Sequence, residues 1–423
     1  MSLDRRSFLT RSAALLGTGG LAAAGTAEVA GHAAPAAAAA QTTTDPAAAQ
    51  AATLNERVPF DALHQSGIIT AAGAEATVAA LDAIAPDRAT LATALQALSS
   101  RARQLADGTV LGPQEVDEPP ADSGTLGTTV APDALTITIG FGATLFDDRY
   151  GLAKQMPAGL KVMPRFPDDT LDDAQSHGDI LLQITANRRD TVVHALRELL
   201  RPVRNAFSLR WAVDGFQSAD RGPTARSARR NLFGFRDGTS NPDVTDDAAM
   251  KRLIWVPGDT GPAWTTDGTF QVVRTIRMHV EFWDRVGLRE QENMIGRSRP
   301  SGAPLGGTDE LQDPRLDLDP EGERIPMDAH IRLANPRDAA TADQRILRRG
   351  YNYSRGFDTA GQLDQGLVFI AFNQDLERQF EAVQGRIAGE PMIDYITPVG
   401  GGYFFVPRGS AGPTDWVGSG AFA

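Results

Sequence analysis

The 423-residue chain contains no cysteine, and only six of its residues are histidine. The absence of cysteine excludes a thiol nucleophile, an iron–sulfur cluster and a disulfide framework. No two histidines stand in a His-x-x-x-His pair, so the sequence gives little support to a zinc or di-iron site. Any metal must therefore be held by histidine, carboxylate, tyrosine or methionine side chains.

Positive charge is also in deficit. The 41 lysines and arginines stand against 53 aspartates and glutamates, a formal net charge of -12. An acidic chain of this kind argues against nucleic acid as the main partner. The hydrophobic fraction of 42% and the charged fraction of 22% are typical of globular proteins. The length allows two or three domains.

The N-terminal segment lacks an apolar run long enough to span a membrane. Arg5-Arg6 precedes a weakly apolar stretch at 13–24, and an alanine-rich tract follows. This order is that of a signal peptide, and the arginine pair favours the twin-arginine route over an ordinary secretory signal. We therefore predict a twin-arginine signal at 1–40, a disordered tether at 41–57, and a periplasmic or extracellular mature protein. Because this route carries folded proteins, it also hints at a bound cofactor.

A strand–helix unit occurs twice in the chain. Alternating β-branched residues predict strands at 135–141 and 179–186, and the latter leads into a helix with one apolar face. A strand is predicted again at 366–372, and the residues after it again place apolar side chains at helical spacing. The two faces comprise Val192, Leu196, Leu199 and Val203, and then Leu376, Phe380, Val383 and Ile387.

The repetition predicts an internal duplication, although two generic strand–helix units would give the same pattern by chance. We expect an α+β fold of two domains, each with a mainly antiparallel sheet covered by helices, at 58–245 and 246–423. A linker is expected near 241–256, where Asn-Pro-Asp indicates a turn. The Gly-, Asp- and Pro-rich stretch at 306–325 is expected to be a long exposed loop.

The most unusual segment is Gly-Phe-Arg-Asp-Gly-Thr-Ser-Asn-Pro at 234–242. Its glycines permit a close backbone approach to a ligand, and its small polar residues offer N–H and hydroxyl groups to an anion. Asp237 is a candidate partly buried carboxylate with a raised pKa. The alternative is an ordinary turn with a solvated aspartate.

The histidines differ in their surroundings. His330 heads a short helix-like run that ends at Pro336, and a single histidine is sufficient to bind a haem iron. Of the others, His32 belongs to the signal and His194 is predicted to be a surface or boundary residue. His64 and His177 are expected in loops, and His279 is expected to be a core residue in a strand.

Three separated motifs occur in the order of a known family: Gly234–Gly238, His330–Arg337 and Ile346–Tyr351. With them, the chain from about 55 to 410 resembles the dye-decolourising (DyP-type) haem peroxidases. Its segments at 64–68 and 400–405 look like the exported subgroup that includes the peroxidase/deferrochelatase of bacterial ferrous-iron uptake operons. The resemblance implies two ferredoxin-like domains, with one haem b per chain in the second domain.

The resemblance also implies residue roles. His330 would be the protein ligand of the iron, Asp237 the acid/base that faces the peroxide, and Arg348 the arginine beside it. The remaining haem contacts that it implies are Gly238, Thr239, Ser240, Arg297, Asn335, Pro336 and Arg337. A carboxylate that acts as the base in place of a histidine would give activity at acid pH.

The implied activity is reduction of hydrogen peroxide at the expense of one-electron donors, either small molecules or ferrous iron. A link to iron acquisition would involve release of iron from haem or oxidation of ferrous iron, with an iron-uptake permease as partner. The alternative is an exported haem carrier without turnover, but a carrier needs neither Asp237 nor Arg348. A homo-oligomer is compatible with these readings, and nucleic acid is not expected as a partner.

Overall fold

The computed structural model describes residues 46–109, 112, 117–219 and 228–423, and the predicted signal peptide lies outside this range. Among the described residues, no helix combines the length and the hydrophobicity needed to cross a membrane. The first element is α1 (Pro46–Leu54), which falls within the predicted disordered tether. The prediction is wrong for these residues because the segment is rich in alanine, the strongest helix former, and has proline at the first helical position.

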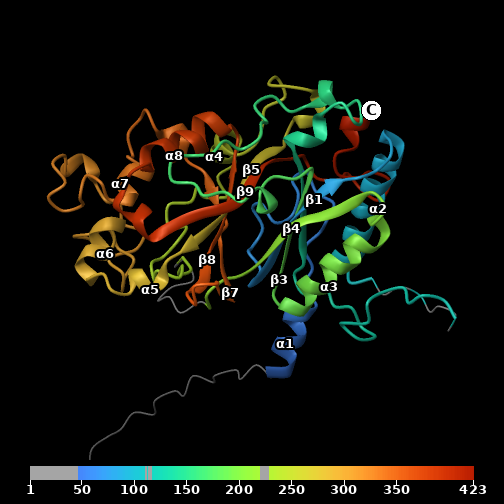
Figure 1. Cartoon of the computed structure of the whole chain (residues 1–423), viewed down its shortest axis with the longest axis horizontal. Coiled ribbons are helices and arrows are strands. Elements are labelled where there is room, and N and C mark those ends of the chain that lie inside the picture. The colour runs from blue at the N-terminus through green and yellow to red at the C-terminus, as the bar shows by residue number, and fades with distance from the viewer. Residues whose placement is uncertain (1–45, 110–111, 113–116, 220–227) are drawn as a thin grey trace, which may run out of the picture. The chain divides into compact units, whose positions relative to one another are not determined.

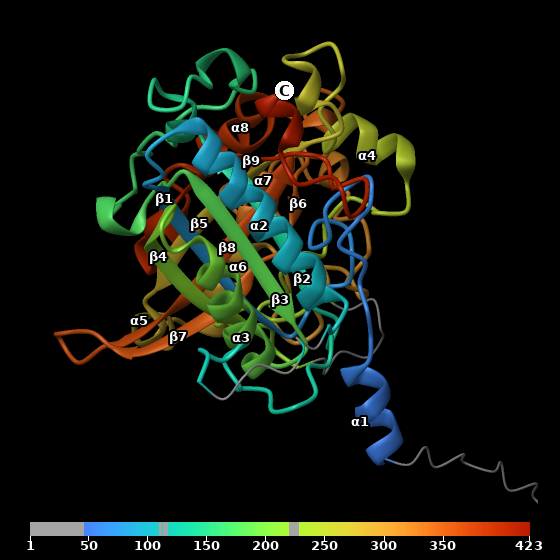
Figure 2. The ribbon, with the colours of Figure 1, turned by 90° about the vertical axis from the view of Figure 1, so that its right-hand side faces the viewer.

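In the described residues of the N-terminal half, two α-helices cover four strands. In chain order they are β1 (Glu75–Ala83), α2 (Arg88–Ala106), β2 (Thr136–Gly142), β3 (Ile180–Ala186), α3 (Arg189–Leu200) and β4 (Phe207–Phe216). Helices α2 and α3 lie next to each other over the N-terminal strands (Figure 2).

The C-terminal half has longer strands and shorter helices. It contains α4 (Asp247–Leu253), β5 (Thr269–Met278), α5 (Val280–Trp283), α6 (Leu288–Ile295), α7 (His330–Ala334), β6 (Leu347–Arg348), β7 (Tyr351–Phe357), β8 (Leu363–Asn373), a π-helix (Leu376–Glu381) that continues as α8 (Ala382–Ile387), and β9 (Ile396–Val406). Figure 1 shows α5 to α8 at the end of the sheet opposite α2 and α3.

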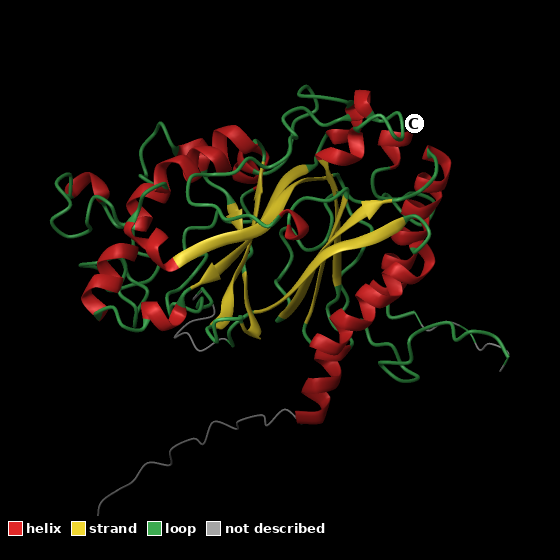
Figure 3. Cartoon of the chain, viewed as in Figure 1, coloured by secondary structure: helices red, strands yellow, loops and turns green. Residues whose placement is uncertain are grey.

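All of these strands belong to one sheet, which closes on itself. The order is β5-β9-β2-β3-β1-β4-β7-β8-β6, and β5 also pairs with β8. Every strand pairing is antiparallel. The two halves meet at two short junctions, one of which is the single pair Phe216 and Asn352. Figure 3 shows the strands in the middle, with helices outside them.

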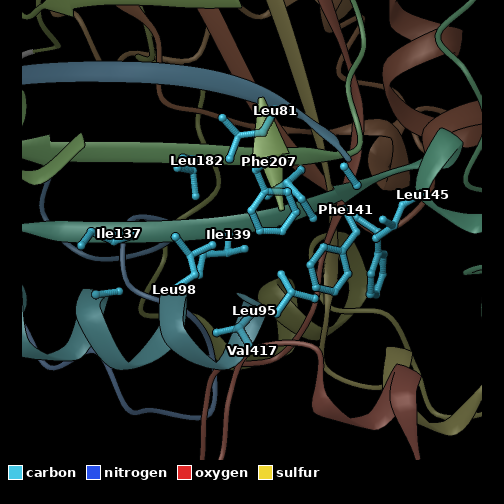
Figure 4. Close-up of a cluster of buried hydrophobic side chains, with 14 of the residues drawn as sticks. Leu81, Leu95, Leu98, Ile137, Ile139, Phe141, Leu145, Leu182, Phe207 and Val417 are labelled. Carbon is cyan, nitrogen blue, oxygen red and sulfur yellow. The ribbon is translucent and has the colours of Figure 1, made fainter. Parts of the chain in front are cut away.

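The outer face of the N-terminal strands packs against α2. This helix begins at the N-cap Asp87, whose carboxylate accepts a hydrogen bond from the backbone of Thr90. Its buried leucines recur at helical spacing, and Leu95 and Leu98 share a buried cluster with Ile137 and Ile139 of β2 and Leu182 of β3 (Figure 4). Removing one such buried leucine typically costs about 2–5 kcal/mol of unfolding free energy. This packing therefore fixes the N-terminal half of the ring.

The structure confirms the predicted α+β class with an antiparallel sheet and helices outside it. The three predicted strands near 135, 179 and 366 are β2, β3 and β8. The helix predicted after β8 is present, although its first turn is a π-helix. The expected linker region contains α4.

Two expectations about exposure are wrong. His194 is only 2% exposed, because the turn that carries Ser123 folds over α3 and places its hydroxyl 2.8 Å from the His194 ring. The segment 306–325 is not uniformly exposed, since Glu310, Leu316 and Asp319 are buried. Neither result is encoded in local polarity, because both depend on contacts with distant parts of the chain.

Candidate active site

A cavity occupies the outer side of the sheet in the C-terminal half. Strands β5 and β8 contribute Ile276, Met278, Leu367 and Phe369 to its wall. These side chains lie on the outer face of the sheet, which in the N-terminal half is packed against helices. The opposite wall is also largely apolar and includes Ile331, Val383 and Ile387. Polar groups enter this apolar space from a few separated segments, which is typical of a binding site for an organic molecule.

His330 is the first residue of α7 and lies on the cavity wall. Its Nδ1 is 2.9 Å from Oε2 of Glu390 and 3.0 Å from Oε1, and Glu390 is only 2% exposed. Burial lowers the pKa of His330, but the charge and hydrogen bond of Glu390 raise it by more, so that it lies above its usual value. Because Nδ1 donates its hydrogen bond to the Glu390 carboxylate, Nε2 is the nitrogen available to a ligand.

Asp237 and Arg348 also line the cavity and are joined directly. Nη1 of Arg348 donates a hydrogen bond of 2.7 Å to Oδ1 of Asp237, and each side chain is about a quarter exposed. The backbone of Arg348 is held by Asn241, whose amide donates to the Arg348 carbonyl at 2.8 Å and accepts from its N–H at 3.0 Å. Gly238 has a φ of +103°, so the turn after Asp237 requires glycine.

Three more arginines of the cavity wall bond mainly to oxygens that carry no full charge. Arg297 donates to two backbone carbonyls, Arg345 to the carbonyl of Ser240, and Arg386 to carbonyls and the Gln344 amide. Burial lowers the pKa of all three, that of Arg297 to about 10. Within the described part of the chain, none of them forms an ion pair. Uncompensated cations in a partly buried wall favour an anionic ligand group.

The predicted site residues largely converge on this cavity. Those that line it are Asp237, Thr239, Ser240, Arg297, His330, Asn335 and Arg348. Gly238 lines an adjoining cavity that shares the Asp237–Arg348 pair as a wall. Arg337 and Pro336 line neither cavity. Arg337 donates a hydrogen bond of 3.2 Å to the hydroxyl of Ser240.

Several contributing residues were missed from the sequence. Glu390, Asn241, Arg345 and Arg386 each contact the cavity or a residue on its wall. Asn241 was visible as part of the unusual 234–242 segment but was interpreted only as a turn. The other three stand in stretches with no unusual composition, so no local signal marks them.

Comparison with known proteins gives consistent matches. Residues 65–217 match the model of the family described as Dyp-type peroxidase, N-terminal, and residues 228–411 match Dyp-type peroxidase, C-terminal. The chain is 45% identical over 408 residues to the deferrochelatase of Escherichia coli (strain K12), covering 95% of this chain and 94% of that protein. It is 46% identical over 371 residues to the deferrochelatase of Shigella flexneri serotype 5b (strain 8401), covering 86% and 87%.

Solved structures resemble the fold over most of its length. The DyP-type peroxidase from Cellulomonas bogoriensis superposes with a TM-score of 0.77 at 35% identity, covering 87% of this chain and 99% of that one. Ferric DtpA from Streptomyces lividans gives a TM-score of 0.78 at 35% identity, covering 87% and 97%. The similarity therefore extends through both halves of the sheet ring.

Proposed function

This chain belongs to the Dyp-type peroxidase family and is a haem peroxidase, and we propose that His330 binds the haem iron while Asp237 and Arg348 act on the peroxide. The observation that carries the proposal is the convergence of these three residues, from separate segments, on one apolar cavity. The proposed cofactor is one haem b per chain.

The cavity has the chemistry that haem requires. Its apolar walls suit the macrocycle, and the free Nε2 of His330 suits the iron. Haem carries two propionates, and the cationic side of the cavity offers Arg297 and Arg345 without carboxylate partners among the described residues. We assign Arg337 to the same role, because Arg337 and Arg345 both donate hydrogen bonds to Ser240. Gly238, Thr239, Asn335 and Pro336 complete the contacts that we propose.

When bound, haem supplies a redox-active iron that draws electrons from donors and passes them to peroxide. The Asp237 carboxylate takes the proton from one peroxide oxygen and delivers it to the other, which leaves as water. The Arg348 guanidinium is always cationic and stabilises the negative charge that develops as the O–O bond breaks. Asn241 holds the backbone of Arg348, and Glu390 fixes the ring of His330.

A second role concerns iron. The deferrochelatases at 45% identity support the proposal that this chain also releases iron from haem. Oxidation of ferrous iron is the alternative iron-linked activity that we propose, with an iron-uptake permease as partner. A carrier without turnover is disfavoured, because a carrier gains nothing from the Asp237–Arg348 pair. Incubating the purified enzyme with haem and a ferrous chelator tests the release: iron-free porphyrin is the expected product, and unchanged haem contradicts the proposal.

We also propose that the ring arose by duplication of a ferredoxin-like unit, with domains at 58–245 and 246–423. In the N-terminal half the order across the sheet is β4-β1-β3-β2, and in the C-terminal half it is β9-β5-β8-β7. When the two-residue strand β6 is left out, numbering the strands within each half gives 4-1-3-2 twice. The repeated order supports the duplication, and separate expression of residues 58–245 as a folded domain would test it.

We propose that the N-terminal signal peptide is a twin-arginine signal. Arg5 and Arg6 precede Phe8 and Leu9, as that route requires. Replacing both arginines with lysine should retain the protein in the cytoplasm, which fractionation would measure. Normal amounts outside the cytoplasm would contradict the proposed route.

The proposed roles of Asp237 and Arg348 are tested by mixing the ferric enzyme rapidly with peroxide at several pH values. Asp237→Asn should slow the reaction by about 10²–10⁴-fold, because the group that moves the proton is lost. Arg348→Leu should slow it by about 10²–10³-fold, because the fixed positive charge beside the peroxide is lost. Asp284→Asn and Arg289→Leu alter exposed residues outside the cavity wall and serve as matched controls. If Asp237→Asn and Arg348→Leu both react at the wild-type rate, the assignment of these residues is wrong and a haem carrier without turnover is favoured.

A further inference from the structure

A buried carboxylate lies behind the turn that carries Asp237. Glu310 is 8% exposed and belongs to the segment 306–325. Its Oε1 accepts hydrogen bonds from the backbone N–H of Ala228 at 2.8 Å and from the hydroxyl of Thr239 at 3.0 Å. Its Oε2 is 3.1 Å from Nε of Arg236, in an ion pair that is shielded from solvent on both sides.

These three contacts surround Asp237. Arg236 precedes it, Thr239 follows two residues later, and Ala228 belongs to the facing side of the turn. The two sides are already connected, because Arg236 donates to the Ala228 carbonyl at 2.8 Å and the N–H of Asp237 donates to the Arg229 carbonyl at 2.9 Å. A single carboxylate therefore ties together both sides of the turn from which Asp237 extends.

The turn needs such an external support. Gly234 and Gly238 both have positive φ values, of +85° and +103°, so its backbone is built from residues with weak conformational preferences. Glu310 in turn is fixed in place: its carbonyl accepts a hydrogen bond of 2.9 Å from Arg297. A Cβ at Gly302 would lie 2.6 Å from Cδ of Arg236 and 3.2 Å from Cγ of Glu310, so the packing around the ion pair is tight.

We propose that Glu310 is a positioning residue, which directs the Asp237 carboxylate toward Arg348 and toward the peroxide. The inference rests on the proposed function, because Glu310 acts only through Asp237 and does not line the cavity. Proton transfer depends steeply on the placement of the acid or base, and a displacement of about 1 Å can cost about 10²-fold in rate. Loosening the turn should therefore slow the reaction with peroxide while haem remains bound.

The test is a double-mutant cycle on the holoenzyme. Glu310→Gln keeps the shape of the side chain but removes the charge that faces Arg236, and we expect the rate of reaction with peroxide to fall by about 10²-fold. In the Asp237→Asn background the same substitution should cause no further fall, because the group that it positions is gone. Glu323→Gln, an exposed change of the same kind in the same segment, should keep the wild-type rate.

Haem content and the pH profile are measured alongside the rate. The inference is overturned if Glu310→Gln reacts at the wild-type rate, or if it slows the enzyme equally with and without Asp237. Should Glu310→Gln fail to fold, Thr239→Val removes only one of the three contacts, and an unchanged rate in that variant overturns the inference. Failure of the proposed function looks different: Asp237→Asn alone would then match the wild type.

Discussion

The two halves of the sheet ring have the same strand order but use their outer faces differently. In the N-terminal half, the connection from β1 to β2 contains one long helix, α2, whose leucines fill the outer face. In the C-terminal half, the connection from β5 to β7 contains α5, α6, α7 and β6, all of them short, and carries both His330 and Arg348. The sheet therefore supplies the frame in both halves, while the connection from β5 to β7 supplies His330 and Arg348.

The same contrast holds for single side chains on equivalent faces. Leu182 of β3 is fully buried against the N-terminal helices, whereas Leu367 of β8 is partly exposed on the cavity wall. A leucine of the packed half contributes to folding, because its burial removes apolar surface from water. A leucine of the cavity wall contributes chiefly when a ligand covers it. Substitutions that separate these two contributions will test the comparison.

The largest effect is expected at the residue that most distinguishes the C-terminal half. His330→Ala removes the only imidazole that lines the described cavity, so we expect loss of bound haem and of the Soret band. His279→Ala is the matched control: His279 follows β5 and lies 2.9 Å from the Thr397 hydroxyl, outside the cavity wall. Absorption spectra and haem content per chain measure both variants. Loss of haem in His279→Ala alone would show that the wrong histidine was assigned.

The second prediction compares Leu182→Ala with Leu367→Ala in the haem-free protein. Leu182→Ala should lower the free energy of unfolding by about 2–5 kcal/mol, because it creates a void in a packed core. Leu367→Ala should lower it by less, because the side chain already borders a cavity. Urea unfolding of both variants measures the difference. Equal losses would mean that the two faces are packed alike and that the comparison is wrong.

The sequence predicted the parts of the molecule whose signal is local. Strands β2 and β3 show alternation of β-branched residues, and the helix after β3 shows a single apolar face. His330, Asp237 and Arg348 were found through motifs within a few residues of each, and the structure brings them to one cavity. Their chemical roles stay predictions until variants are measured.

The missing parts depend on contacts between distant segments. Glu390 meets His330 across 60 positions, and Glu310 meets Thr239 across 71. Closure of the ring depends partly on the single pair of β4 and β7, for which no alternation or turn gives a signal. Even the burial of His194 follows from a hydrogen bond across 71 positions. Local patterns cannot encode such pairings, because either partner alone resembles an ordinary polar residue.

The smallest effect concerns the packed half and depends on pH. Burial lowers the pKa of His194 below its ordinary value of 6.5, so the folded chain keeps this ring neutral where the unfolded chain takes up a proton. At this position the unfolded state then binds more protons as pH falls below about 6.5, so the contribution of His194 lowers the free energy of unfolding through this range. His194→Gln removes the titrating ring and should flatten that decrease. Part of the decrease should remain, because burial also lowers the pKa of His64, His177 and His279. Urea unfolding of the haem-free protein between pH 5 and 8 measures the slope, and an unchanged slope in His194→Gln would show that this buried histidine does not contribute to it.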